Sequence, residues 1–419
     1  MPKRGHGVPP ESMPGAGEAE RLAGLAAGLL ALVCLTARSQ AQSRGIDQVH
    51  FLTREGIVFQ RFFDRFARGA RWPEQSVLFH ASRLATFAAS LFPEGWRGLG
   101  RFFSVYHDAN WVELSTSLNA PTAIREGQPA PSIADNVRGQ ALAEFIAADE
   151  QTKTWIAEIA QHRHRELAGY LARHHPSITR AGTAVLVDIG WRGSIQDNLA
   201  LALPGIEWHG VYCGLLPYFN TQPKNCHKSG ILFDPAQTGY LAANVMPLEF
   251  LFDAGVGGVV GYRGGEPVHA PQDDHVRGSD FVARFQRTLE DRATDCGQLL
   301  ADASTDGTAA SLQAAWRDDA LAFWAATQHM SAEMFEAFSV FRHDETFGIA
   351  STVQISDVTS WRSMLRGLFD YRTRHLFSQH SQSIPIHLWR SSQLGWRTRA
   401  WMFLLATASK TRSLIKGRQ

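Results

Sequence analysis

The stretch VLVDIGWRGSIQDNLA at positions 185–200 decides how the chain is interpreted, because it joins three kinds of sequence. Its first residues are apolar and mostly β-branched, which is typical of a buried strand. A short loop with two glycines, an arginine and a serine follows, and then a helix-like segment begins. A strand, a glycine-bearing loop and a helix in this order predict an α/β unit whose loop can hold an anion at the helix N-terminus.

Strands and helices alternate on both sides of this stretch. Apolar strand segments without clean alternation indicate a parallel sheet that is covered on both faces. We therefore predict an α/β fold with a mostly parallel, Rossmann-like sheet, a helical insertion and a helical C-terminal part. The predicted strands are 48–53, 77–82, 183–189, 207–216, 230–233 and 259–262. The predicted helices are 18–43, 57–67, 83–92, most of 137–175, 194–203 and most of 276–340.

The predicted domain organisation follows from where this alternation starts and stops. A tail rich in Pro and Gly is expected to be disordered, and basic residues dominate the other end of the chain. The expected parts are a disordered tail 1–17, an α/β core 18–275 with a helical insertion at about 93–176, a mainly helical part 276–385 and a basic amphipathic tail 386–419.

Composition restricts the classes of partner. The chain has 419 residues and a formal net charge of +1, so no overall positive field points to nucleic acid, and no nucleic-acid partner is expected. Four cysteines without metal-ligand spacing indicate a reducing, cytoplasmic location. His162 and His164 are two residues apart, so on a helix they point to different faces and cannot chelate together. No metal site is predicted.

The apolar segment LAGLAAGLLALVCL at 22–35 has two interpretations. It falls short of the roughly 20 apolar residues that a membrane span needs. A signal peptide is the alternative, because Ser39-Gln40-Ala41 ends in a small residue. Glu18 and Glu20 place acid where a signal peptide carries base, so a buried helix is favoured.

Three loops that follow predicted strands share an arginine, a residue that binds phosphate through two parallel hydrogen bonds. Ligands of open parallel sheets bind outside the carboxyl ends of the strands, so these loops predict an anion-binding crevice. The structural alternative is that Arg54 pairs with Asp188, the glycines shape a turn and Ser194 caps a helix. The predicted ligand-binding residues are Arg54, Glu55, Gly56, Ser82, Arg83, Gly190, Trp191, Arg192, Gly193 and Ser194, and Asp188 is the predicted catalytic residue.

Several of these segments, in this order, resemble the C-terminal region of predicted haloacid-dehalogenase-superfamily hydrolases. Those bacterial proteins often occur with glycosyltransferases in surface-polysaccharide gene clusters. Their hydrolase part lies upstream and uses an Asp-x-Asp motif, whereas Asp188 is followed by Ile-Gly-Trp. The resemblance therefore implies the accessory region without hydrolase activity. It rests on HFLTREG (50–56), LFHASRLA (78–85), VDIGWRGSIQDNL (187–199), GVYCGL (210–215), PLEFLF (247–252) and GGVVGY (257–262).

A looser likeness connects the loop after 183–189 with phosphoribosyltransferases, which surround a sugar phosphate with a strand, an acidic loop and a helix. It implies a phosphoribosyltransferase-like sheet, with Asp188 on sugar hydroxyls and Gly193 and Ser194 on phosphate. That family has two adjacent acids in the loop, whereas Asp188 stands alone and Trp191 and Arg192 follow.

The C-terminal segment 390–419 combines basic residues with Trp and Leu and contains no acid. Such a helix suits the surface of an anionic membrane. The alternative is a final helix docked on the domain. Its basic residues are Arg390, Arg397, Arg399, Lys410, Arg412, Lys416 and Arg418.

These observations support two hypotheses. In the first, the protein acts in surface-polysaccharide biosynthesis and binds a phosphorylated or nucleotide sugar, with glycosyltransferases as candidate partners. If it is an enzyme, glycosyl or phosphoryl transfer is expected, with Asp188 and Arg54 central. No cofactor is predicted, and Mg²⁺ is left open. The expected location is the cytoplasm, with a peripheral position on the inner membrane as an extension. In the second, it is a non-catalytic binding or scaffold module.

Overall fold

The computed structural model describes residues 17–120, 124, 130–236, 245–271, 279–328, 330–338, 342–344 and 352–354. Nearly all of the predicted disordered tail (1–16 of 1–17) and the whole of the predicted basic tail (386–419), including the candidate membrane segment 390–419, lie outside these residues.

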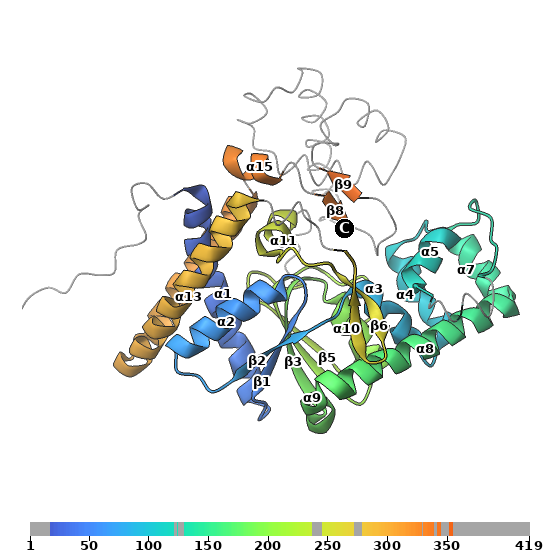
Figure 1. Ribbon diagram of the computed structural model, residues 1–419, viewed down its shortest axis with the longest axis horizontal. Coiled ribbons are helices and arrows are strands. Elements are labelled where there is room, and N and C mark those ends of the chain that lie inside the picture. Colours follow the sequence, from blue (N-terminus) through green and yellow to red (C-terminus); the bar gives the residue numbers. More distant parts are fainter. Residues whose placement is uncertain are drawn as a thin grey trace, which may run out of the picture.

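The centre of the molecule is a five-stranded parallel sheet with the order β2-β1-β3-β4-β5 (Figure 1). This confirms the predicted α/β fold with a parallel, Rossmann-like sheet. Parallel neighbours require long crossover connections, and helices supply most of them. The strands are β1 (Gln48–Leu52), β2 (Gln75–Phe79), β3 (Thr183–Trp191), β4 (Glu207–Leu215) and β5 (Cys226–Gly230).

Side chains of the central strand β3 alternate between two hydrophobic cores. Val185 and Val187 belong to one core, and Ala184 and Leu186 belong to the other. The first core lies under long helices that come from both ends of the described chain, and Figure 1 shows α1, α2 and α13 on this side of the sheet. Its helices are α1 (Glu18–Gln42), α2 (Gly56–Gly69), α11 (Met246–Phe252), α13 (Asp280–Asp306), α14 (Ala309–Gln328) and α15 (Ala332–Phe338).

Helix α1 contains the apolar segment with two interpretations. It is long and apolar enough to cross a membrane by length and composition, but 67% of its most apolar window is buried inside the protein. Gly28 allows the close approach of α14, because a Cβ atom there would lie 2.9 Å from the carbonyl oxygen of Trp316. In the folded chain this segment is therefore a core helix, as the sequence favours.

The second face of the sheet is covered by α3 (Arg83–Phe87), α8 (Glu150–His174), α9 (Pro176–Ala181) and α10 (Ser194–Ala202), together with the hairpin of β6 (Val259–Arg263) and β7 (Glu266–His269). Helix α8 ends before Pro176, as predicted, and Pro176 begins α9 at its first position. The predicted helix 137–175 is two helices, because Asp149 caps α8 by accepting from the backbone N–H of Thr152.

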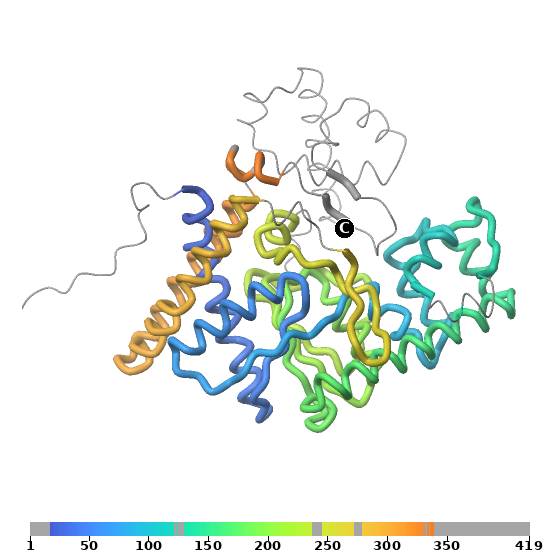
Figure 2. The backbone as a smooth tube through the Cα atoms, in the orientation of Figure 1, coloured from blue at the N-terminus to red at the C-terminus, as the bar shows by residue number. Residues whose placement is uncertain are grey.

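The predicted helical insertion forms a third core of its own. Figure 2 shows it to one side of the sheet, connected to the core through α8. Trp155 and Ile159 of α8 complete this core. Its other elements are the 3₁₀ turns Ala88–Leu91 and Gly95–Leu99 and the helices α4 (Gly100–Val105), α5 (Trp111–Leu118) and α7 (Gly139–Ala148).

The clearest differences from the sequence-based prediction are a strand and a helix. The fifth strand was predicted at 230–233 but is Cys226–Gly230. It is a polar edge strand, so the apolar Ile231, Leu232 and Phe233 beside it gave a misleading signal. Helix α11 falls in a region predicted to be irregular. A short antiparallel pair, β8 (Arg342–Asp344) and β9 (Thr352–Gln354), completes the described elements.

Candidate functional site

The strand order places a topological switch point between β1 and β3. The chain runs from β1 outward to β2 and returns to β3 on the other side of β1. Ligands of doubly wound sheets bind outside the carboxyl ends of the strands at such a point. Arg54 and Glu55 directly follow β1, and Asp188 lies near the end of β3. Two of the three predicted loops therefore meet where this fold binds ligands.

Arg54 connects the loop after β1 with the end of α11. Its guanidinium lies 3.2 Å from a carboxylate oxygen of Glu55 and 3.2 Å from one of Asp253. Both acids are buried, whereas 43% of the Arg54 side chain is exposed. These carboxylates, Glu55 first, raise the pKa of Arg54 further, so it remains charged. Within the described residues Arg54 thus pairs with these two acids, and the alternative in which it pairs with Asp188 is wrong.

Asp188 is buried, with 6% of its surface exposed. One of its carboxylate oxygens accepts a hydrogen bond of 2.9 Å from the backbone N–H of Ile189. Burial raises the pKa of Asp188 well above its ordinary value, and the nearby charge of Glu55 adds to this, whereas Arg83 opposes it. Asp188 therefore favours its protonated form more strongly than an exposed aspartate does.

Glu249, on α11, faces the same group of residues. Burial raises its pKa, and the indole N–H of Trp191, which donates to it at 2.9 Å, opposes the shift together with the charges of Arg54 and Arg83. We define the carboxyl-edge cluster as the charged residues that meet here: Arg54, Glu55, Arg83, Asp188, Glu249 and Asp253. Carboxyl groups with raised pKa values occur often at functional sites.

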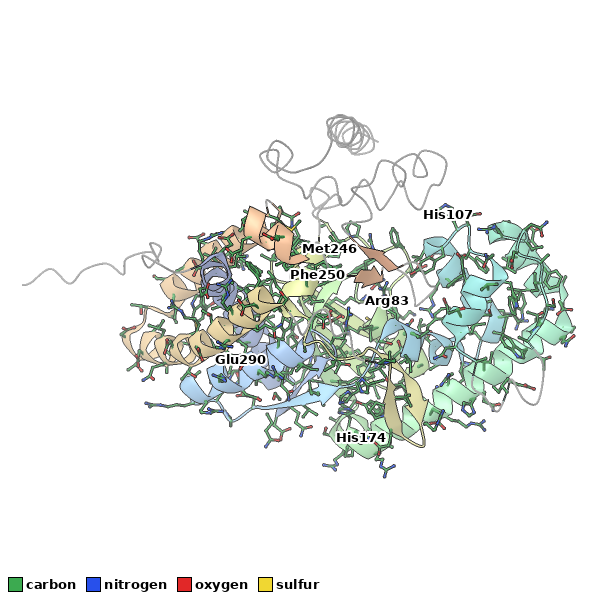
Figure 3. All side chains as sticks on the ribbon, turned by 45° about the horizontal axis from the view of Figure 1, so that its top comes forward. Arg83, His107, His174, Met246, Phe250 and Glu290 are labelled. Atoms are coloured by element: carbon green, nitrogen blue, oxygen red, sulfur yellow. The ribbon has the colours of Figure 1, made fainter. Side chains whose placement is uncertain are left out.

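The loop after β2 contributes one residue to the cluster and one to its support. Ser82 caps α3, because its hydroxyl accepts from the backbone N–H of Ala85 and donates to the carbonyl oxygen of Val259 at 2.5 Å. Arg83, the first residue of α3, acts electrostatically on Asp188 and Glu249. Figure 3 shows Arg83 near the middle of the molecule. Ser82 therefore fixes the start of the helix that carries Arg83.

The predicted glycines allow close packing. Gly190 has φ 140°, and a Cβ atom there would lie 2.5 Å from the carbonyl oxygen of Gly214. Gly193 is left-handed, with φ 63°, and a Cβ atom there would lie 2.8 Å from the hydroxyl of Tyr212. At Gly56 the nearest atom would be the carbonyl carbon of Phe51, at 3.0 Å. These contacts explain the glycines by the approach of backbone to backbone and of loop to sheet.

Arg192 and Ser194 lie apart from the cluster. The guanidinium of Arg192 donates to the carbonyl oxygen of Pro217 and covers the ring of Phe219 at 3.7 Å. Ser194 lines a separate cavity of about 60 Å³ beside Arg101. Strand β3 continues past Asp188 to Trp191, where it pairs with Leu215 of β4, and Arg192 and Ser194 come after this end of the strand. The structure therefore does not bring these two predicted residues together with Arg54.

Sequence reasoning missed Glu249 and Asp253. Both belong to the segment at α11, which packs onto the first core through Phe252, whose ring lies 4.9 Å from that of Phe59. A single acid inside the apolar run PLEFLF, with another directly after it, was the available signal. The spacing alone could not show that this run returns to the switch point.

Comparison with known proteins adds no constraint to this site. A scan against models of protein families finds no match, and a search of curated proteins finds none that matches the chain. The resemblance to haloacid-dehalogenase-superfamily proteins therefore stays a prediction.

Proposed function

We propose that the carboxyl-edge cluster binds a phosphorylated or nucleotide sugar. The supporting observation is the meeting, at the switch point, of Arg54 and Arg83 with the buried carboxyl groups of Asp188 and Glu249. Guanidinium groups bind phosphate oxygens with charge-assisted hydrogen bonds. A protonated carboxyl group both donates and accepts hydrogen bonds, so it can hold a sugar hydroxyl in either role.

The charges of the cluster are compatible with an anionic ligand on one condition. Four acids beside two arginines would repel a phosphate if all were ionised. Burial favours the neutral forms of Asp188 and Glu249, which removes part of that repulsion. Glu55 and Asp253 offer carboxylate oxygens of the kind that hold Mg²⁺ together with substrate phosphates. Such an ion would neutralise phosphate charge, so Mg²⁺ is a candidate cofactor.

Glycosyl or phosphoryl transfer would use Asp188 as the catalytic residue. A carboxyl group with a raised pKa can protonate a leaving oxygen as a general acid. The alternative class is a binding or scaffold module without turnover. This alternative is supported by how accessible the two residues are to a ligand. Asp188 is buried and accepts a hydrogen bond from the Ile189 N–H, whereas Arg54 is much more exposed.

The biological setting of this proposal rests on the sequence resemblance. A sugar-phosphate ligand suits surface-polysaccharide biosynthesis, in which glycosyltransferases would be the partners. The proposed location is the cytoplasm, with the inner membrane surface as an additional contact through 390–419.

Calorimetric titration of the full chain tests the proposal. The ligands are UDP-glucose, glucose 1-phosphate, phosphoribosyl pyrophosphate and inorganic phosphate, each with and without Mg²⁺. Arg54→Gln and Arg83→Gln should each weaken binding about tenfold or more, since a charge-assisted hydrogen bond contributes about 1.5–3 kcal/mol. Arg61→Gln is the matched control, because Arg61 is an exposed arginine on α2 whose partner is Glu290.

The proposal fails if no sugar phosphate binds, or if the control variant weakens binding as much as the two cluster variants. Turnover separates the two classes. Asp188→Asn should keep binding within a few-fold and abolish any transfer, since the amide resembles the neutral carboxyl group but has no transferable acid proton. Binding without any turnover by the wild type would favour the scaffold module.

A further inference from the structure

A second group of polar residues lies at the opposite edge of the sheet, where β4 and β5 begin. Glu207 and His209 are two residues apart on β4, so they project from the same face of the strand. His227 is the direct register partner of His209 on the parallel neighbour β5. The pairing of the two strands therefore brings three potential metal ligands to one face.

The three side chains are close enough to share one ion. The rings of His209 and His227 stack, with centroids 4.7 Å apart and an interplanar angle of 13°. Nε2 of His227 lies 3.0 Å from a carboxylate oxygen of Glu207. One ligand atom from each residue lies within 4.8 Å of the other two. Ligands of a tetrahedral zinc ion stand about 3.3 Å apart, given bonds of about 2.0–2.1 Å, so small side-chain rotations would close the site.

The chemistry of this set selects a class of ion. Two imidazole nitrogens and one carboxylate oxygen suit Zn²⁺ and similar transition-metal ions, whereas Mg²⁺ and Ca²⁺ prefer ligand sets made of oxygen. The side chains of Glu207 and His227 are 54% and 52% exposed, which gives an ion a path from solvent.

We propose that Glu207, His209 and His227 form a binding site for one Zn²⁺ or similar divalent transition-metal ion. The ion attaches the edge strand β5 to β4 and keeps a coordination position for water or another ligand, as three-ligand zinc sites do. The site is independent of the carboxyl-edge cluster, because it lies where the strands begin. Arg44, which follows α1, brings positive charge near His209 and works against the ion.

Zinc titration of chelator-treated full chain, in competition with a chromogenic chelator, tests the proposal. Wild type should bind one tight equivalent, and His209→Gln and His227→Gln should each weaken this binding at least tenfold, since even residues that only orient ligands contribute 10–100-fold. Glu207→Gln should weaken it less than either histidine variant, because the amide oxygen is uncharged. Arg44→Gln should tighten it by removing a repulsive charge.

His107→Gln is the matched control. His107 is an exposed histidine of the insertion and belongs to neither β4 nor β5, and its loss should leave the tight equivalent unchanged. Folding of each variant is checked by its melting temperature in chelator. Since His209 is less exposed than its partners and its variant could unfold, the exposed His227→Gln variant and the visible spectrum of the Co²⁺-loaded wild type provide independent measurements.

Three results would overturn the metal site. One is the absence of a tight zinc equivalent in the wild type. Another is equal affinity in wild type and His227→Gln. The third is a Co²⁺ spectrum of six-coordinate, all-oxygen type. In each case the group is only a surface hydrogen bond between Glu207 and His227.

Discussion

Two clusters of polar side chains on the same sheet differ in whether they contain ion pairs. The carboxyl-edge cluster retains charge, because Arg54 lies between Glu55 and Asp253. The histidine cluster, His50, His80 and His175, is packed among aromatic rings. His175 stacks on Phe79 at 4.5 Å and shares a hydrogen bond of 2.8 Å with Tyr170. No aspartate or glutamate forms an ion pair with these three histidines among the described residues, so nothing there stabilises a protonated imidazole.

The comparison shows that burial favours the neutral form of both histidine and aspartate side chains. Acidic pH therefore affects the two kinds of residue in opposite ways. Burial lowers the pKa of His50 to about 4 and that of His175 to about 3, so both are unprotonated at neutral pH. Burial raises the pKa of Asp188, which favours its protonated form. Low pH therefore destabilises the buried neutral histidines, whereas it keeps Asp188 in the protonated form that burial favours. The partly exposed Arg54 at the carboxyl edge is the basis of our proposal that an anionic ligand binds there.

The largest expected effect is acid destabilisation through the histidine cluster. The unfolded chain protonates His50 below about pH 6.5, whereas the folded chain does so only near pH 4. Stability is therefore lost as pH falls from 6.5 to 4, by roughly 3 kcal/mol from this residue alone. Urea unfolding at pH 7 and pH 4.5 should show a smaller acid loss in His50→Leu than in wild type. Equal losses would mean that His50 does not control acid stability.

A smaller effect is expected when the cluster loses its exposed cation. Arg54→Gln removes the guanidinium that pairs with the buried Glu55 and Asp253. Breaking a fully buried ion pair costs about 3–5 kcal/mol. Since 43% of Arg54 is exposed, solvent screening reduces the expected loss to about 1–2 kcal/mol. Urea unfolding at pH 7 measures it, with Arg61→Gln as the control. An unchanged midpoint would show that the two ion pairs contribute little to stability.

A change of opposite sign is expected at Asp188. Its raised pKa means that ionisation lowers stability as pH rises above the ordinary aspartate range. Asp188→Asn cannot ionise, so its melting temperature relative to wild type should be higher at pH 8 than at pH 5. Part of the gain is offset, because the amide adds donors that need partners. Melting curves across this range test the prediction, and a difference independent of pH would contradict the raised pKa of Asp188.

The smallest effect is expected at the beginning of β5. In chelator, His227→Gln should change the free energy of unfolding by less than about 0.5 kcal/mol, because half-exposed side chains contribute little. In excess Zn²⁺ the wild type should gain more stability than His227→Gln, because tighter binding to the folded state stabilises it more. A large loss in chelator would show that His227 has a structural role.

Much of the fold could be predicted because its signals are local. Apolar β-branched runs such as Val185–Val187 indicate strands. A proline such as Pro176 indicates the end of a helix whatever the surrounding fold. The edge strand β5 carries no such run, and helix α11 is too short to show a helical period. Both were missed because packing against neighbours, and not their own composition, determines their conformation.

The candidate site divides in the same way. Arg54, Glu55, Arg83 and Asp188 were predictable, since the loops after parallel strands gather at one edge wherever the strands lie. Arg192 was indistinguishable from them in sequence, although in the structure it contacts Pro217 and Phe219. The sequence by itself thus determined strands β1 to β4 of the five-stranded sheet and the loops that reach its carboxyl edge, because those depend on local periodicity. Only the tertiary structure decided that α11 returns two acids to that edge and that His227 lies opposite His209, because strand register and helix docking depend on contacts between distant segments.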